Sequence, residues 1–265
     1  MRTLLTPRWL GLLLAALALA ATMVFLGRWQ LHRYEERSAI NDRIHAGETG
    51  AAVPADRLLP RPADGPGSVG PALPDDAAWR RVTVTGTYDS AGELLVRNRT
   101  VDSTVGFEVI TPLVTADGTT FLVDRGWIPP SPKGPTVAPS VPAAPTGSVT
   151  ITARVHPSES GGTDTVQVDG RTEIRRVATG PVARFLDKYA VYDGYLLAVD
   201  GSPGATSQPI PVDDENAWQN AAYVVQWWLF AGLTLFGFGY LLRKEHLEGL
   251  AGTPTEASRT AAPVA

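Results

Sequence analysis

The chain has 265 residues, with 23 lysines and arginines against 27 aspartates and glutamates and a formal net charge of −4. This balance argues against a nucleic-acid partner held by bulk positive charge, and the absence of cysteine excludes disulfide scaffolds, thiolate metal sites and cysteine nucleophiles. The 26 glycines and 22 prolines predict folded parts joined by loose segments.

Two long apolar segments predict membrane-spanning helices near the two ends of the chain. Residues 9–27 and 221–242 carry no charge, and at ~1.5 Å per residue each segment can cross a hydrocarbon layer of ~30 Å. The alternative for the first segment is a cleaved signal peptide with Arg2 and Arg8 in its basic region. Its apolar run exceeds the ~7–15 residues of a signal-peptide core, so we expect the helix to be retained.

The charges beside the second segment predict how the chain is oriented in the membrane. Arg243 and Lys244 follow this segment directly, and positive residues mark the cytoplasmic ends of membrane spans. The first segment has arginines on both sides and gives no orientation by itself. We therefore expect a multi-pass protein of the cell membrane, with both termini in the cytoplasm and the intervening region outside it.

Between the two segments the sequence predicts a β-rich domain. From residue 79 onward, apolar and polar residues alternate with the period of two that is typical of strands, and short turn signals favour antiparallel pairing. The expected strands are 82–85, 94–97, 107–110, 121–125, 149–155 and 195–199, and residues 181–189 have helical spacing. The expected fold class is a membrane protein in which N- and C-terminal transmembrane helices flank a mainly antiparallel, barrel-like (α+β) extracytoplasmic domain.

These patterns also predict the domain boundaries. They are a cytoplasmic N-terminus (1–8), the first span (9–27), a helical stalk with a Pro/Gly-rich loop (28–78), the β domain (79–200), a linker (201–220), the second span (221–242) and a disordered cytoplasmic tail (243–265). Within the stalk loop, Leu58 and Leu59 are an expected apolar docking point. Seven prolines in residues 129–147 predict an extended loop rather than a strand.

No pattern of residues predicts catalysis or a metal centre. The sequence has no nucleophile elbow, phosphate loop or dinucleotide-binding motif, and its four histidines have no ligand spacing. The histidines are His32, His45, His156 and His246. We therefore predict a protein that is not an enzyme, with no catalytic residues and no metal site.

Aromatic and amide side chains cluster at the membrane boundaries of both predicted spans. Trp29 and Gln30 end the first span, while Tyr223, Gln226 and Trp227 lie at the start of the second. An interfacial aromatic belt explains the tryptophans and the tyrosine without any further function. It does not explain Gln226, because an amide inside a span is costly unless it is paired. We expect this amide to form an interhelical hydrogen bond.

The predicted strand around Asp124 carries a charged and aromatic motif. Strict alternation places Arg125 and Trp127 on one face and Asp124 on the other, while Gly126 allows a close backbone approach. A cation and an aromatic ring that emerge together suit a partner surface or a propionate. The alternative is a purely structural stack of Arg125 on Trp127 at the rim of a barrel.

Five segments carry a family resemblance. They are residues 26–33 (LGRWQLHR), 81–86 (RVTVTG), 106–113 (GFEVITPL), 122–129 (LVDRGWIP) and 223–227 (YVVQW). In this order, with a span at each end, the chain resembles the surfeit locus protein (SURF1-like) family of cytochrome c oxidase assembly factors, in its actinobacterial type. The resemblance implies motif or partner-contact roles for Gly27, Trp29, Gln30, Arg33, Gly86, Gly106, Thr111, Pro112, Arg125, Gly126, Trp127, Tyr223, Gln226 and Trp227.

The resemblance also implies a function. It implies a non-enzymatic factor that helps the catalytic subunit of a haem-copper oxidase acquire haem a, with that subunit, other assembly factors and the bilayer as partners. Some bacterial members hold haem a through a histidine three residues before the tyrosine of the last motif, and this position is Asn220 here. Because an amide is a poor haem ligand, we expect no tightly bound cofactor. His32 is the alternative haem contact.

Two other function classes remain open from the residues. One is a membrane-anchored extracytoplasmic domain, unrelated to the oxidase, that binds or senses a ligand. The other is an extracytoplasmic hydrolase, which lacks a visible nucleophile and base. Loss of haem a from membranes after deletion of the gene would separate oxidase assembly from both.

Overall fold

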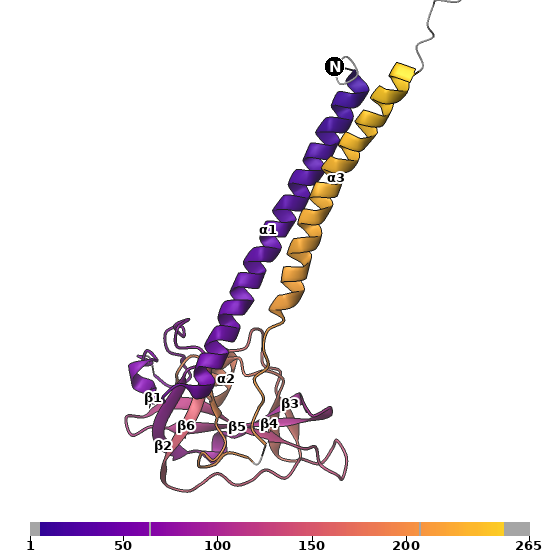
Figure 1. The fold of residues 1–265 in the computed structure, drawn as a ribbon. Helices are drawn as coiled ribbons and strands as arrows, with labels where there is room; N and C mark the ends of the chain where they lie inside the picture. The colour runs from indigo at the N-terminus through magenta and orange to yellow at the C-terminus, as the bar shows by residue number, and fades with distance from the viewer. Residues whose placement is uncertain (1–5, 64, 207, 252–265) are drawn as a thin grey trace, which may run out of the picture. The chain divides into compact units, whose positions relative to one another are not determined.

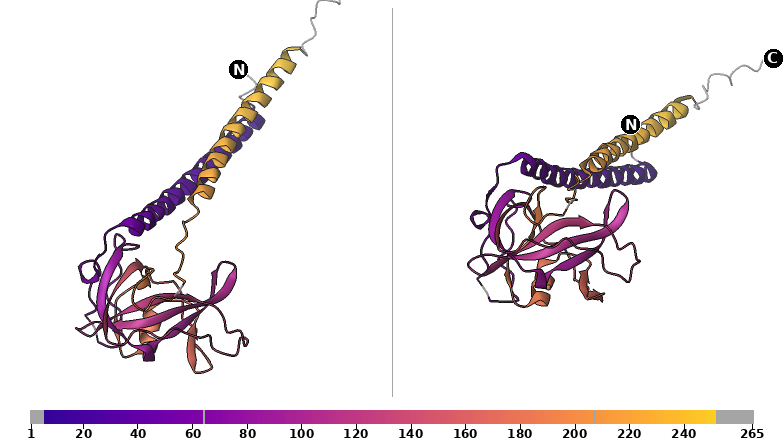
Figure 2. Two further views of the ribbon diagram at one scale, coloured as in Figure 1. Left: turned by 60° about the horizontal axis from the view of Figure 1, so that its bottom comes forward. Right: turned by 90° about the horizontal axis from the view of Figure 1, so that it is seen from below.

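The computed structural model describes residues 6–63, 65–206 and 208–251. The chain forms two compact units. One consists of the residues up to Ile40 together with those from Glu215 onward, and the second consists of Asn41–Asp214. Figures 1 and 2 show the helices of the first unit and the sheet of the second.

The helical unit is an antiparallel pair formed by α1 (Pro7–Thr49) and α3 (Ala217–Ala251). Nε1 of Trp9 donates to Oε1 of Glu245 at 3.0 Å, and Oγ1 of Thr234 lies 3.7 Å from the sulfur of Met23. The start of α1 therefore lies beside the end of α3, as Figure 1 shows. Both helices are long and apolar enough to cross a membrane, which supports the two predicted spans. The helical stalk expected after the first span is the continuation of α1, which ends at Thr49.

The last turns of α1 belong to the β unit, whose ten strands form one mixed sheet. The strands are β1 (Val53–Pro54), β2 (Arg81–Tyr88), β3 (Leu94–Val101), β4 (Thr104–Val114), β5 (Thr119–Ile128), β6 (Ser148–His156), β7 (Val166–Val168), β8 (Arg171–Ile174), β9 (Ala190–Val191) and β10 (Tyr195–Ala198). Their order is β1-β2-β6-β10-β5-β4-β3-β8-β7, and β9 pairs with β5. Within the described residues, six pairings are antiparallel and four are parallel.

A second pairing of β2, with β4, joins five strands into a closed circuit. The circuit runs β2-β6-β10-β5-β4 and returns to β2 through Thr87 opposite Val114. Alternation along β5 then separates two cores: Phe121 and Val123 pack in one cluster, and Leu122 packs in the other. The first cluster also holds Leu59, so the predicted docking of the stalk loop is confirmed.

The second cluster is covered by α2 (Thr179–Leu186). The helix presents Val182, Ala183 and Leu186 to the sheet, while Phe185 on its other side is 44% exposed. The cluster joins these residues to Leu94, Ile110, Leu122 and Leu197. The helical spacing read from residues 181–189 is therefore confirmed over most of its length.

The sequence-based prediction missed one hairpin. Strands β7 and β8 are three and four residues long and are connected by Asp169 and Gly170, both with positive φ. An Asp-Gly pair between two short runs is a hairpin signal, so the sequence contained this information. No strand lies in residues 129–147, where the prolines predict a loop.

Candidate functional site

Two β-bulges decide which side chains share a face of the sheet. In β5, Asp124 is opposite Ile110 and Trp127 is opposite Glu108, so Arg125 and Gly126 together face a single residue of β4. Gly126 has φ 118°, which glycine adopts without strain. The bulge places Asp124 and Trp127 on the same face. The prediction that Arg125 and Trp127 share a face is therefore wrong, because it assumed unbroken alternation.

Arg125 points to the opposite face and is buried, with 1% of its surface exposed. Its Nη1 donates to Oε2 of Glu93 at 3.0 Å, its Nη2 to the carbonyl of Pro142 at 2.7 Å, and its Nε to the carbonyl of Gly204 at 2.7 Å. The guanidinium carbon lies 5.8 Å from the ring centre of Tyr88. Arg125 thus links three segments of the chain inside the domain. The expectation that it contacts a partner from the surface is wrong.

Trp127 is also part of the fold. It is 5% exposed, and its Nε1 donates to the carbonyl of Arg99 at 2.9 Å. Its ring lies against Gly106, where an added Cβ would lie 2.4 Å from the indole. The alternative interpretation, a stack of Arg125 on Trp127, is likewise wrong because each side chain has other partners.

The remaining predicted contact residues of the β domain also have internal roles. A Cβ added to Gly86 would lie 2.6 Å from the carbonyl of Val114, so this glycine lets β2 approach β4. Thr111 donates to Oε2 of Glu93 at 3.2 Å, and the carbonyl of Pro112 accepts from the backbone of Asp89. The family motifs of this domain therefore maintain the sheet.

The predicted residues of the helical unit lie along α1 and α3. Gly27 lies directly against Trp228, because an added Cβ would be 2.2 Å from Nε1 of that indole. Trp29 is 53% exposed, and Gln30 is half-buried. Arg33 forms an ion pair with Glu36 at 3.1 Å. Of these, Gly27 has a packing role that the structure explains directly.

Tyr223, Gln226 and Trp227 lie on one stretch of α3. Tyr223 is 39% exposed, Gln226 is exposed, and Trp227 packs edge-on against Phe230 with ring centres 6.4 Å apart. Within the described residues, Gln226 has no hydrogen bond to α1. The predicted interhelical hydrogen bond is therefore absent from the described part of the chain, and a bond to another protein stays a prediction.

The two positions considered for haem contact are both polar sites on these helices. His32 is exposed, and its Nε2 lies 3.1 Å from a carboxylate oxygen of Glu36. Asn220 is half-buried, and its amide nitrogen donates to the carbonyl of Asn216 at 3.4 Å. In the part of the chain that the structure describes, no three histidines or acidic residues lie close enough to hold a metal ion.

Sequence reasoning missed a cluster of ionisable residues on the other face of the sheet. A second bulge at Asn98, which has φ 64°, brings Arg99 onto the face of Glu108 and Asp124. Arg99 lies 2.9 Å from Glu108 and 2.5 Å from Glu159. These groups line a cavity of about 240 Å³, together with Trp79, His156 and Tyr195. The two bulges bring these residues to one face. A prediction that assumes strict alternation along the strands places them on different faces and misses the cluster.

The cluster contains a pair of buried carboxyl groups. Oε2 of Glu108 forms its ion pair with Nε of Arg99, whereas Oδ2 of Asp124 is buried without a hydrogen-bond partner and the other oxygen of Asp124 accepts from the backbone of Gly126 at 2.9 Å. Burial raises the pKa of Glu108 to about 7, and burial together with the negative charge of Glu108 raises the pKa of Asp124. A proton on one carboxyl supplies the donor that the other lacks.

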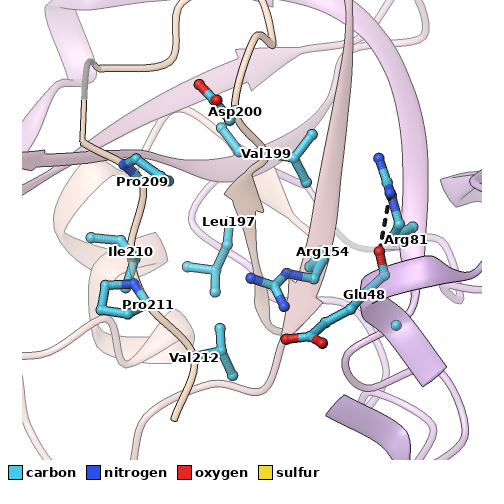
Figure 3. Close-up of a pocket in the computed structure, with 12 residues that line it drawn as sticks. Glu48, Arg81, Arg154, Leu197, Val199, Asp200, Pro209, Ile210, Pro211 and Val212 are labelled. Carbon is cyan, nitrogen blue, oxygen red and sulfur yellow. Dashed lines mark hydrogen bonds between the residues drawn. The ribbon is translucent and has the colours of Figure 1, made fainter. Parts of the chain in front are cut away.

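A larger cavity lies farther along the same face. It has a volume of about 510 Å³ and lies beneath a segment of residues 208–213, which we call the strap. Arg81 and Arg154 lie opposite each other in β2 and β6 and both line it (Figure 3). Leu197 forms part of its floor. The sequence analysis includes Arg81 only as part of the motif 81–86 and does not predict its proximity to Arg154, because only strand pairing brings the two together.

The fold defines a class of protein: a mixed β domain that lies in the sequence between two helices long and apolar enough to cross a membrane. The family model of the SURF1 family matches residues 17–232. The chain therefore belongs to the SURF1 family.

Relatives in other organisms agree with this assignment. The chain is 34% identical over 246 residues to uncharacterized SURF1-like proteins of Mycobacterium tuberculosis and Mycobacterium bovis, which covers 91% of this chain and 86% of each relative. It is 30% identical over 105 residues to a yeast cytochrome oxidase assembly protein of Saccharomyces cerevisiae, covering 39% of this chain and 24% of the relative. The predicted family is thus confirmed.

Proposed function

We propose that this protein is an assembly factor for a haem-copper cytochrome c oxidase and assists haem a insertion into the catalytic subunit. The observation that carries the proposal is membership of the SURF1 family over residues 17–232, since a yeast relative is named a cytochrome oxidase assembly protein. Oxidase activity in membranes tests it. Deletion of the gene should lower cytochrome c oxidase activity and leave a bd-type oxidase unchanged. Equal loss of both activities would contradict the proposal.

The proposed location is the cell membrane, with both termini in the cytoplasm. Trp9 near the start of α1 contacts Glu245 near the end of α3, so the outer ends of the two helices lie together. Arg243 and Lys244 mark this end as cytoplasmic by the positive-inside rule. The β domain then lies outside the cytoplasm, where it can meet the outer part of a membrane-embedded oxidase subunit.

The packing of α1 on α3 should depend on Gly27. In Gly27→Leu the new side chain would overlap Trp228, because a Cβ alone lies 2.2 Å from its Nε1. The chain has no cysteine, so cysteines introduced at Met23 and Thr234 can be linked by a short bifunctional maleimide. We expect a several-fold lower yield of the link in Gly27→Leu. Gly11→Leu is the matched control, since nothing lies within 4 Å of its Cβ; equal yields in the two variants would contradict this packing.

We propose that Gln226 bonds to a helix of the oxidase subunit. Its side chain is exposed on a helix whose lipid-facing residues include Phe236, which is 72% exposed. An interhelical hydrogen bond in a membrane contributes ~0.6–2 kcal/mol, so Gln226→Leu should reduce co-purification of the catalytic subunit about 3- to 30-fold. Gln219→Leu, an exposed position outside the predicted span, is the control. A loss of similar size in both variants would count against a specific bond.

We further propose that the protein does not retain haem a through Asn220. The position holds an amide that bonds within its own helix to the carbonyl of Asn216. Purified protein should therefore contain haem a far below one equivalent, and Asn220→His should raise this content measurably in the absorption spectrum. If the unchanged protein purifies with one equivalent of haem a and His32→Ala removes it, His32 is the ligand and this proposal fails.

A further inference from the structure

The cavity under the strap is lined by two arginines, Arg81 and Arg154, and by two acidic residues, Glu48 and Asp200, and no ion pair joins the two pairs within the described residues. Arg81 donates from Nη1 to the backbone carbonyl of Glu48 at 3.2 Å, and its Nε is buried without a hydrogen-bond partner (Figure 3). Arg154 donates no hydrogen bond within the described part of the chain. The carboxylate of Glu48 is exposed, and among the described residues no ion pair joins it to either arginine. The cavity thus holds two guanidinium groups with free donors.

The two arginines oppose each other directly in an antiparallel strand pair. Like charges at such positions destabilise a sheet. Burial lowers the pKa of Arg154, Glu48 raises it, and Arg81 lowers it further. An anion between the two guanidinium groups would relieve this repulsion and accept bonds from both.

The rest of the cavity is largely apolar. Leu197 and Val199 form its floor in Figure 3, and Pro209, Ile210 and Val212 of the strap face them. Its volume of about 510 Å³ lies within the ~300–1,000 Å³ of small-molecule sites. A ligand that fills it would place an anionic head on the arginines and an apolar body under the strap.

A neighbouring cavity extends the positive surface. It has a volume of about 410 Å³, shares Gly47 and Arg81 with the first, and adds Arg43 and Arg80. Nε of Arg43 is also buried without a hydrogen-bond partner. Both cavities therefore meet at the last turns of α1, inside the β unit.

We propose that the cavity beneath the strap binds an anionic amphiphile, an alkyl carboxylate or alkyl phosphate, through Arg81 and Arg154. The apolar tail contacts Leu197 and the strap, and the head accepts hydrogen bonds from both guanidinium groups. This site does not depend on the proposed role in oxidase assembly, because its residues and its binding test involve no oxidase.

Calorimetric titration of the full chain in nanodiscs of zwitterionic lipid, with empty discs subtracted, tests the site. Octyl phosphate should bind at least tenfold more tightly than octanol or inorganic phosphate. Arg154→Gln should weaken octyl phosphate binding at least tenfold, and Arg154→Lys, which keeps the charge, should weaken it less. Arg57→Gln, an exposed cation outside both cavities, should bind as the unchanged chain does.

Two results would overturn the proposal. They are octanol or inorganic phosphate binding as tightly as octyl phosphate, and unchanged binding in Arg154→Gln. Retained near-UV circular dichroism of that variant would show that the domain is folded. Discs that contain phosphatidylglycerol distinguish the source of the anion. If this lipid weakens the binding of octyl phosphate, the site takes a lipid headgroup. If octyl phosphate binds as tightly as before, the site takes a soluble anion.

Discussion

Arg125→Met is expected to lower the free energy of unfolding of the β domain by about 3–5 kcal/mol, the cost of breaking a buried ion pair by removing one partner. Arg125 is 1% exposed and holds Glu93 together with the carbonyls of Pro142 and Gly204. Its loss leaves Glu93 with Arg171, at 2.6 Å, and the hydroxyl of Thr111, and it leaves the carbonyls of Pro142 and Gly204 without this donor. The Pro-rich loop and the segment before the strap should both loosen.

Hydrogen exchange of the β5 amides, measured by mass spectrometry on the full chain in detergent, gives the opening free energy at this site. Arg171→Met is the matched control, because this arginine pairs with the same glutamate but its side chain is 41% exposed. We expect an effect below about 1 kcal/mol there. An Arg125→Met effect as small as that of the control would contradict the assigned role.

The second large effect is a loss of stability as the pH rises. The pKa of Glu108 is raised from 4.5 to about 7 in the folded domain, and that of Asp124 is raised as well, in both cases first by burial. Above pH 4.5 the folded state therefore binds a proton that the unfolded state has released. This stabilisation is fully present below pH 4.5 and is lost as the pH rises through 7.

At about 1.4 kcal/mol per pKa unit, the loss between pH 5 and pH 8 should approach about 3 kcal/mol. Glu108→Gln keeps a neutral, hydrogen-bonding side chain beside Asp124 and should reduce this dependence, while burial still raises the pKa of Asp124. Urea unfolding at several pH values, followed by the exchange of β5 amides, measures it. Asp164→Asn, an exposed control, should keep the slope of the unchanged protein. An equal slope in Glu108→Gln would contradict the shared proton.

The alternation of residues predicted the main strands and α2, because their apolar faces pack against two separate clusters. Alternation could not predict to which face of the sheet a side chain points after a bulge. Gly126 inside a strand predicts room for an approaching backbone, which the structure confirms, since an added Cβ would lie 2.7 Å from the carbonyl of Gln208, but the same glycine also marks a bulge that the sequence analysis does not predict. At Asn98, a second residue with positive φ, the sequence alone gave less warning. Errors at these two residues account for the misplaced Arg125 and for the missed cluster.

The cavity under the strap could not be inferred from local sequence. Arg81 and Arg154 are 73 positions apart and meet only because β2 pairs with β6. The strap begins at Gln208, which forms a β-bridge with Trp127 of β5. In the helical unit, Gly27 was among the predicted motif residues, but its contact with Trp228 depends on the pairing of α1 with α3. The contact roles of the exposed Trp29 and Gln226 stay predictions.

Haem a content per oxidase catalytic subunit, measured in membranes of a strain that lacks this gene, tests the role in oxidase assembly most directly. Reduced-minus-oxidised spectra give haem a, and an immunoblot gives the subunit. Our account predicts a several-fold lower ratio in the deletion strain and its recovery when the intact gene is restored. A ratio equal to that of the parent strain, with the catalytic subunit present, would contradict a role in haem a insertion.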